Sequence, residues 1–282
     1  MDMSQKQSTQ VLAIASGKGG VGKTNVAINF ALALAERENR VTIMDADLGL
    51  ANIDVLLNLR PLRNLSHVIE GDCQLKDIII DGPGNIKIIP AASGIKMMSH
   101  LNPAQHVGLV YAFDEIEKNT DYLIIDTAAG ISDSVIRFCS AAQEVMVVVC
   151  NDPASIADAY ALIKTLNKEH RIHRFQIVVN KVKTDAEGCL LFERLCSVTE
   201  QFLDVVLNLM AIIPEDEYVL KSVRQRRPCF LAFPPAKVNK TFKKMALSAD
   251  SNRKAPKASG RLMFFAEKLV SVHHQKVSGA IS

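Results

Sequence analysis

The residues with the clearest chemical meaning lie between positions 16 and 25. The stretch Gly17-Lys-Gly-Gly-Val-Gly-Lys-Thr24 fits the pattern G-x-x-x-x-G-K-[ST]. In such a loop the glycines let backbone N–H groups curl around phosphate oxygens, Lys23 neutralises the β- and γ-phosphates, and the Thr24 hydroxyl binds Mg²⁺. We therefore predict a nucleoside triphosphate site. Its nucleotide-binding residues are predicted to be Gly17, Lys18, Gly19, Gly20, Val21, Gly22, Lys23, Thr24 and Asn25.

Three aspartates are candidates for holding the metal and for the hydrolysis step. Asp45 and Asp47 follow an apolar segment, and Asp126 follows four apolar residues, which is the form of a Walker B strand. We predict that Thr24, Asp47 and Asp126 hold Mg²⁺. Because an ordinary aspartate is a poor base at neutral pH, Asp47 is expected to orient the attacking water. Asp45 either supports the waters of the metal or caps its strand.

A later asparagine is the candidate for contact with the base. Asn180 follows an apolar run, and its side-chain amide offers a donor and an acceptor to a purine edge. The amide alone does not distinguish ATP from GTP. The guanine-reading pattern of GTPases is Asn-Lys-x-Asp, whereas this chain has Asn180-Lys-Val-Lys183. The missing aspartate favours ATP.

Recurring apolar segments must position these residues. The expected strands are 10–16, 40–45, 86–91, 122–126, 145–150, 175–180 and 209–214, and the expected helices include 26–35, 103–118, 132–142, 155–168 and 187–203. This alternation predicts an α/β fold, with a doubly wound, mostly parallel sheet flanked by helices. Ligands of such sheets lie at the carboxyl ends of the strands, where the candidate residues fall.

Composition narrows the class of protein. The 282 residues are 48% hydrophobic, which is enough for a large core, and the net charge of +3 does not by itself indicate nucleic-acid binding. The basic residues between 221 and 227 are interpreted as a solvated face, so no specific nucleic-acid binding is expected. Residues 1–10 lack the apolar core of a signal peptide, and the six cysteines lack C-x-x-C spacing. We expect a cytoplasmic protein.

The phosphate loop has a lysine directly after its first glycine. This lysine, Lys18, makes the loop resemble the deviant loop of the MinD/ParA family of P-loop ATPases. In that family the lysine crosses a dimer interface to the nucleotide of the partner. The resemblance therefore implies an ATP-dependent homodimer, with catalytic roles for Lys18, Lys23 and Asp47.

The family resemblance also bears on the base and on iron–sulfur chemistry. It implies that Asn180, together with Pro214 and Glu215 after the last expected strand, frames the adenine ring. The nitrogenase iron protein belongs to the same family and places a ligand cysteine shortly after Walker B. Residues 131–134 contain no cysteine, so iron–sulfur chemistry is rejected and Mg²⁺ is the metal expected.

Further segments resemble the FlhG/FleN family of flagellar-number regulators over residues 10–235. The segments are Asp45–Asp54, Val68–Gly71, Pro90–Gly94, Asp126–Gly130 and Ala142–Val145. The resemblance implies a slow, Mg²⁺-dependent ATPase that restrains flagellar number by binding a FleQ-type transcription activator and an FlhF-type GTPase. Many relatives carry an N-terminal Asp-Gln-Ala box that stimulates the GTPase, and residues 1–10 contain none. The alternative is a MinD/ParA-type ATPase that uses the same chemistry to position a septum or DNA.

The C-terminal region completes the expected domain organisation. We predict a flexible N-terminus over 1–9, an ATPase domain over 10–247, a basic linker over 248–260, and an amphipathic helix with a tail over 261–282. Leu262, Phe265 and Leu269 share one face of that helix. Such a helix either lies on an anionic membrane surface, at the inner membrane or cell pole, or docks on the domain itself. Both alternatives stay open.

Overall fold

A single sheet of eight strands organises the chain. The computed structural model describes residues 8–47, 53–90, 112–113, 116–253 and 266–269. The strands are β1 (Gln10–Ser16), β2 (Val41–Ala46), β3 (Ile80–Asp81), β4 (Lys87–Pro90), β5 (Tyr122–Ala129), β6 (Glu144–Cys150), β7 (Arg174–Val182) and β8 (Val206–Pro214). Their order in the sheet is β3-β4-β2-β5-β1-β6-β7-β8, and all neighbours are parallel except β3 and β4.

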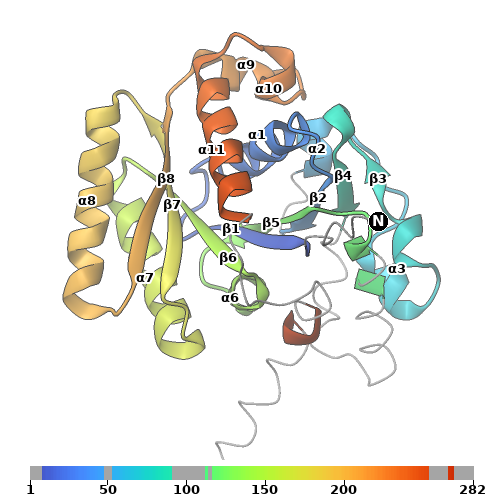
Figure 1. Ribbon diagram of the computed structural model, residues 1–282, viewed down its shortest axis with the longest axis horizontal. Helices are drawn as coiled ribbons and strands as arrows, with labels where there is room; N and C mark the ends of the chain where they lie inside the picture. Colours follow the sequence, from blue (N-terminus) through green and yellow to red (C-terminus); the bar gives the residue numbers. More distant parts are fainter. Residues whose placement is uncertain (1–7, 48–52, 91–111, 114–115, 254–265, 270–282) are drawn as a thin grey trace, which may run out of the picture.

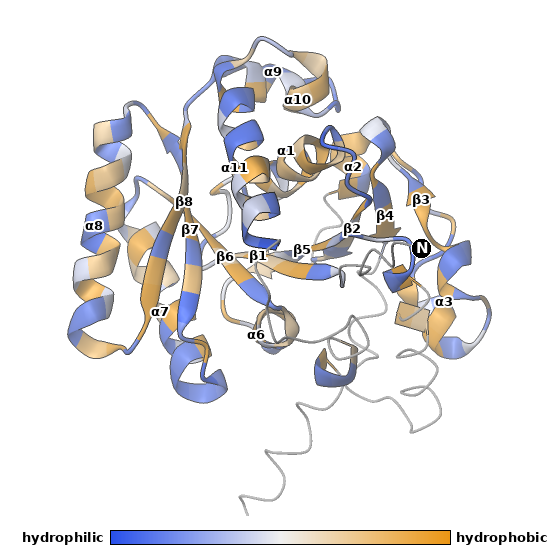
Figure 2. Cartoon of the chain, in the orientation of Figure 1, coloured by the Kyte–Doolittle hydropathy of each residue, from blue (hydrophilic) through white to orange (hydrophobic). Residues whose placement is uncertain are grey.

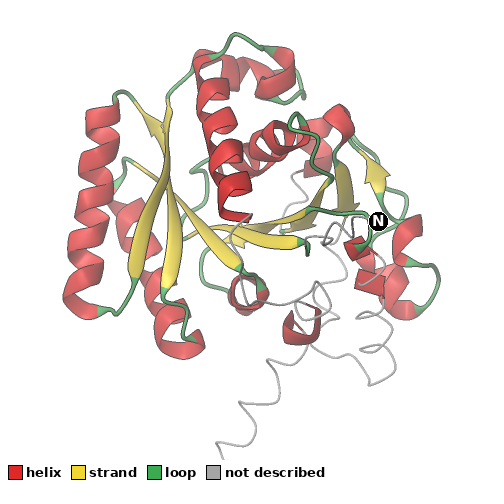
Figure 3. Cartoon of the chain, viewed as in Figure 1, coloured by secondary structure: helices red, strands yellow, loops and turns green. Residues whose placement is uncertain are grey.

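Helices cover both faces of this sheet. They are α1 (Lys23–Ala35), α2 (Ile53–Leu57), α3 (Leu65–Glu70), α6 (Asp133–Ala141), α7 (Pro153–His170), α8 (Asp185–Phe202), α9 (Glu217–Arg224), α10 (Cys229–Ala232) and α11 (Lys237–Arg253), with short 3₁₀ turns at Leu75–Asp77 and Pro83–Asn85. Figures 1 and 3 show α1, α10 and α11 on one side of the sheet and α6 and α7 on the other.

The core consists of aliphatic layers on the two sides of the sheet. One cluster joins α1, α10 and α11 to the strands, and two further clusters join α3, α6, α7 and α8 to the opposite face. Figure 2 shows hydrophobic residues gathered along the strands, while the helices alternate between hydrophobic and hydrophilic residues. Burial on both faces explains why the central strands are almost continuously apolar.

The expected α/β architecture is confirmed, and the differences lie in detail. Every predicted strand is present, with ends that shift by up to three residues. The two-residue strand β3 was not predicted, because Ile80–Asp81 is too short to show a pattern, and it pairs antiparallel with β4. Most of the predicted helix at 103–118 lies outside the described residues.

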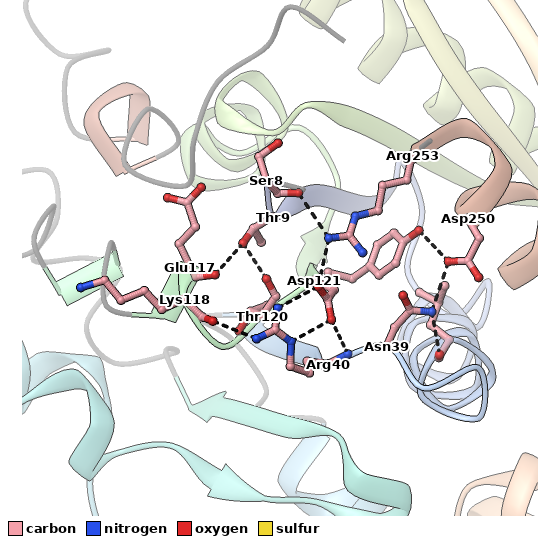
Figure 4. Close-up of polar contacts among 12 residues, drawn as sticks. Ser8, Thr9, Asn39, Arg40, Glu117, Lys118, Thr120, Asp121, Asp250 and Arg253 are labelled. Carbon is pink, nitrogen blue, oxygen red and sulfur yellow. Dashed lines mark hydrogen bonds and ion pairs between the residues drawn. The ribbon is translucent and has the colours of Figure 1, made fainter. Parts of the chain in front are cut away.

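The prediction that a linker begins at residue 248 is wrong, because the chain is still helical there. Residues 248–253 are the last turns of α11. The charged side chains of Asp250 and Arg253 point to the domain (Figure 4). Asp250 Oδ2 lies 2.5 Å from Arg37 Nε, and Asp250 Oδ1 accepts a hydrogen bond from the Tyr122 hydroxyl at 2.9 Å. Arg253 Nη2 lies 3.0 Å from Asp121 Oδ1. Because these partners are distant in the sequence, the sequence shows only a polar segment here, and a linker was predicted. Residues 254–260 lie outside the described part.

The C-terminal segment that the structure describes packs on the domain. Ala266 and Leu269 are 0% and 1% exposed, in one cluster with Val11 and Leu123 of the sheet. The docked alternative therefore describes Leu269, whereas Leu262 and Phe265 lie outside the described residues. Among the described residues, no helix has both the length and the apolar character needed to span a bilayer.

Candidate functional site

The phosphate loop connects the central strand β1 to α1. Gly17 and Lys18 follow β1, Gly19 and Gly20 are exposed, and Val21 is buried. Gly22 precedes the first residue of α1 with a φ of 92°, a left-handed conformation that favours glycine. The loop thus delivers backbone N–H groups and the positive end of a helix to one place, which is a site for phosphate.

Lys23 and Asp126 form a buried ion pair at the base of this loop. Lys23 Nζ lies 2.5 Å from Asp126 Oδ1, and the two side chains are 7% and 0% exposed. Burial raises the pKa of the Asp126 carboxyl, and the charge of Lys23 opposes that rise. The predicted Walker A and Walker B residues therefore meet, although their sequence positions are 103 residues apart.

Asp45 supplies a second carboxylate to the site, and its role is structural. Asp45 and Asp126 are register partners on the neighbouring strands β2 and β5. Burial, followed by the charge of Asp126, raises the pKa of Asp45 to about 7. The two Asp45 oxygens accept hydrogen bonds from the backbone N–H groups of Asp47 and Ile53, both at 3.2 Å. Asp45 thus caps the strand end, positions half-buried Asp47, and holds the start of α2.

The residues present fit a bound Mg²⁺. Carboxylates of Asp45, Asp47 and Asp126 converge at the carboxyl ends of β2 and β5, close to the first turn of α1 that carries Thr24. Asp126 Oδ2 is buried, and among the described residues it has no hydrogen-bond partner. A buried carboxylate oxygen without a donor suits a water of a hydrated Mg²⁺, which binds through oxygen ligands.

The predicted base-binding residue also supports the phosphate loop. The Asn180 Nδ2 amide donates to the Val21 carbonyl at 2.8 Å, and a methyl group on Gly22 would come within 2.5 Å of the same nitrogen. Lys181, at a φ of 60°, donates from Nζ to the Gly20 carbonyl at 2.7 Å. The end of β7 therefore fixes the loop. This role was not predicted from the sequence, in which the position of Lys181 beside Asn180 is the one local sign of it.

The remaining predicted residues lie around the same edge of the sheet. Pro214 ends β8 as the register partner of Val182, and the Glu215 N–H donates to the Val182 carbonyl at 2.8 Å. Asn25 is half-buried in the first turn of α1. The structure therefore brings Asn180, Pro214 and Glu215 to the ends of adjacent strands, as framing one side of a base requires.

Lys18 makes its contact within its own chain. Its Nζ lies 2.5 Å from Asp152 Oδ2, and Asp152 is the residue that caps α7. The hydrogen bond between them raises the pKa of Lys18 and lowers the pKa of Asp152, so both are charged at neutral pH. Asp152 follows β6, the strand next to β1. No motif had pointed to Asp152.

Comparisons with known proteins identify relatives over nearly the whole chain. A family model described as "ParA: NUBPL iron-transfer P-loop NTPase" matches residues 7–249. The antiactivator FleN of Pseudomonas aeruginosa is 52% identical over 268 residues, which cover 95% of this chain and 96% of FleN. The flagellum site-determining protein YlxH of Helicobacter pylori is 32% identical, over 79% of this chain and 75% of YlxH.

Solved structures share the fold. The MinC:MinD cell division protein complex of Aquifex aeolicus matches with a TM-score of 0.69 and 23% identity, over 90% of this chain and 99% of that chain. The septum site-determining protein MinD of Pyrococcus horikoshii, complexed with Mg-ADP, matches with a TM-score of 0.66 and 22% identity, over 89% of this chain and all of that chain. At these identities the similarity concerns the fold alone.

Proposed function

Because the chain belongs to the MinD/ParA family of P-loop ATPases, we propose that it is an ATP-operated dimeric switch that restrains flagellar number. The observation that carries this proposal is the 52% identity to an antiactivator along almost the full length of both chains. An antiactivator opposes a transcription activator. The related YlxH is named for determining flagellar sites, which supports the same biological setting.

The site residues have separate tasks in ATP binding and hydrolysis. The loop from Gly17 to Gly22 surrounds the phosphates, and Lys23 exchanges its contact with Asp126 for the β- and γ-phosphates. Thr24, Asp47 and Asp126 are the residues that would hold Mg²⁺, which neutralises phosphate charge when bound. Asp47, positioned by Asp45, orients the attacking water.

The base side of the site favours ATP. Asn180 lies at the end of β7, with its Nδ2 bonded to the Val21 carbonyl, next to Pro214 and Glu215 at the end of β8. No aspartate follows Asn180 at the position that reads the amino group of guanine. Calorimetry with ATP and GTP on the same preparation tests this choice, and comparable affinities for both nucleotides would count against it.

The dimer is the active state of the proposed switch. ATP binding brings two protomers together, and Lys18 of each contacts the nucleotide of the other. Gel filtration without nucleotide, with ADP and with ATP is the direct test. We expect a dimer with ATP alone in the wild type and monomers in Lys18→Ala under all conditions. A normal ATP-dependent dimer in that variant would refute the role of Lys18 across the interface.

We propose two partners, which the resemblance to the flagellar-number regulators implies. They are a FleQ-type flagellar transcription activator and an FlhF-type GTPase. Pull-down of each purified partner by the wild type, with ATP and with ADP, tests whether they recognise the dimer.

Deleting the gene and counting flagella and minicells separates flagellar control from the alternative, a septum- or DNA-positioning role. Extra flagella without minicells are expected.

Association with a membrane stays a prediction. It requires Ala266 and Leu269 to leave their buried positions, which ATP-dependent dimerisation would have to promote. Co-sedimentation with anionic vesicles, comparing the full chain with a chain ending at residue 259, tests it. Equal sedimentation of both chains with ATP would exclude this segment as the anchor.

A further inference from the structure

The contact between Lys18 and Asp152 is built from two adjacent strand ends. Lys18 follows β1 and Asp152 follows β6, and these strands are parallel neighbours in the sheet. The two side chains are 36% and 40% exposed, so the ion pair lies at the surface of the protomer. The residue that the proposed function sends to a second protomer is thus held by a carboxylate of its own protomer.

Asp152 keeps its position without help from Lys18. Its Oδ1 accepts a hydrogen bond from the Ala154 N–H at 2.8 Å, as an N-cap does, and its own N–H donates to the Cys150 carbonyl at 2.7 Å. Only Oδ2 contacts Lys18. Because α7 fixes the carboxylate, the long lysine side chain is the partner that moves when the pair opens.

The pair is suited to a reversible contact. Both groups are charged at neutral pH, so the pair does not depend on a pH change. Ion pairs at this degree of exposure contribute little to stability and are screened by salt. A contact of this strength biases the lysine toward its own protomer, yet it opens readily when phosphates offer a larger negative charge.

We propose that Asp152 is a positioning residue that holds Lys18 within its own protomer, so that dimerisation requires Lys18 to exchange Asp152 for the nucleotide of the partner. This inference rests on the proposed ATP-dependent dimer. The exchange raises the protein concentration needed for dimerisation, and it occurs twice in each dimer. Asp152 therefore acts as a brake on dimerisation.

The substitution Asp152→Asn tests the brake, because asparagine is a good N-cap of the same size and lacks the charge. The dissociation constant of the dimer is measured by analytical ultracentrifugation with a non-hydrolysable ATP analogue. We expect the variant to dimerise at a roughly tenfold lower protein concentration than the wild type, from two released ion pairs. The difference should shrink in 0.5 M salt, roughly a fivefold higher ionic strength than in the first measurement.

Two further variants separate charge from structure. Asp152→Ser also keeps a capping side chain and should shift the dissociation constant in the same direction. Asp216→Asn makes the identical change at the N-cap of α9, where the carboxylate accepts from the Tyr218 N–H, and should leave the constant unchanged. Thermal unfolding of each variant should match the wild type within a few degrees, which shows that α7 is intact.

The outcomes distinguish this inference from the proposed function. If the wild type dimerises with the analogue and Lys18→Ala does not, but Asp152→Asn and Asp152→Ser dimerise no better than the wild type, the brake is refuted. A weaker dimer in these variants would also refute it, since Asp152 would then assist the interface. If the wild type itself stays monomeric with the analogue, the proposed function fails together with the inference.

Discussion

Acidic and basic side chains have different roles at the carboxyl ends and at the amino ends of the strands. At the carboxyl ends, Asp45 and Asp126 lie on adjacent strands with one lysine, Lys23, between the loop and the sheet. At the amino ends, Asp121 is contacted by two arginines, Arg40 and Arg253 (Figure 4). The first arrangement concentrates negative charge, whereas the second neutralises it. The comparison indicates that the first end is arranged for a cation and phosphates and the second for stability.

The pKa values express this difference. At the carboxyl ends, burial and a neighbouring carboxylate raise the pKa of Asp45 to about 7. At the amino ends, partial burial acts to raise the pKa of Asp121, but hydrogen bonds from Arg40 and Arg253 outweigh it and hold the pKa below its usual range. A raised carboxyl pKa opposes folding at neutral pH, and a lowered one supports it.

The largest expected effect comes from Lys23→Ala. It should abolish ATP binding and lower the free energy of unfolding by about 3 kcal/mol, because fully buried Asp126 loses the cation that pairs with it. Calorimetry with ATP and urea unfolding measure the two effects. Adding Asp126→Asn should recover most of the stability but no ATP binding. Unchanged nucleotide affinity in Lys23→Ala would contradict the assignment of the loop.

Asp47→Ala should separate function from stability at the same end of the sheet. We expect ATP turnover to fall about a hundredfold, since the water loses its orientation, while an ATP-bound dimer accumulates. Turnover assays and gel filtration with ATP measure both. Unfolding should change little, because Asp47 is not part of the buried pair. Wild-type turnover in this variant would exclude Asp47 from the hydrolysis step.

Asp121→Asn addresses the opposite end. It should lower the free energy of unfolding at pH 7 by about 2 kcal/mol, since Arg253 is only 10% exposed and loses its charged partner. ATP affinity should stay within twofold of the wild type. A loss of ATP binding at unchanged stability would break the division between the two ends.

The pH dependence of that difference has a definite sign. Because the pKa of Asp121 is lower in the folded chain than in the unfolded chain, its contribution is fully present above about pH 4 and declines as the pH falls from there toward the low pKa of the folded chain. Urea unfolding of wild type and Asp121→Asn between pH 3 and pH 7 measures it. The difference in stability between the two proteins should be largest above about pH 4 and smaller, but not zero, at pH 3, and a difference that does not narrow across this range would argue against the ion pairs.

Tyr122→Phe should give the smallest effect. It removes the hydroxyl that donates to Asp250 at 2.9 Å but leaves the contact between Asp250 and Arg37 in place. The expected loss in the free energy of unfolding is about 1 kcal/mol, measured by urea unfolding. A much larger loss would mean that α11 depends on this hydroxyl more than on its ion pairs.

The two ends also differ in how far they could be predicted from sequence. Gly17 to Thr24 form one contiguous motif, and Asp126 ends an apolar run, so both were found without knowledge of the fold. Asp250 and Arg253 looked like linker residues because their partners, Arg37 and Asp121, lie more than 100 positions away. Contacts of this kind are set by tertiary placement, and no local pattern contains them.

Within the candidate site, the functional residues could be predicted from their types, but their contacts could not. The sequence indicated that Lys18 and Asn180 matter, because their chemistry suits a nucleotide. It did not indicate that Asp152 holds Lys18 or that Asn180 fixes the Val21 carbonyl. These partners follow from strand order, which places the ends of β6 and β7 beside β1 and the loop.

The packing at the first residue of the loop has a mechanical consequence. A methyl group on Gly17 would lie 2.2 Å from the carbonyl of Asp158 in α7, so the loop and this helix are in direct backbone contact. A close-packed contact of this kind transmits displacement instead of absorbing it. A displacement of the loop at Gly17 would therefore be passed directly to the backbone of α7 around Asp158.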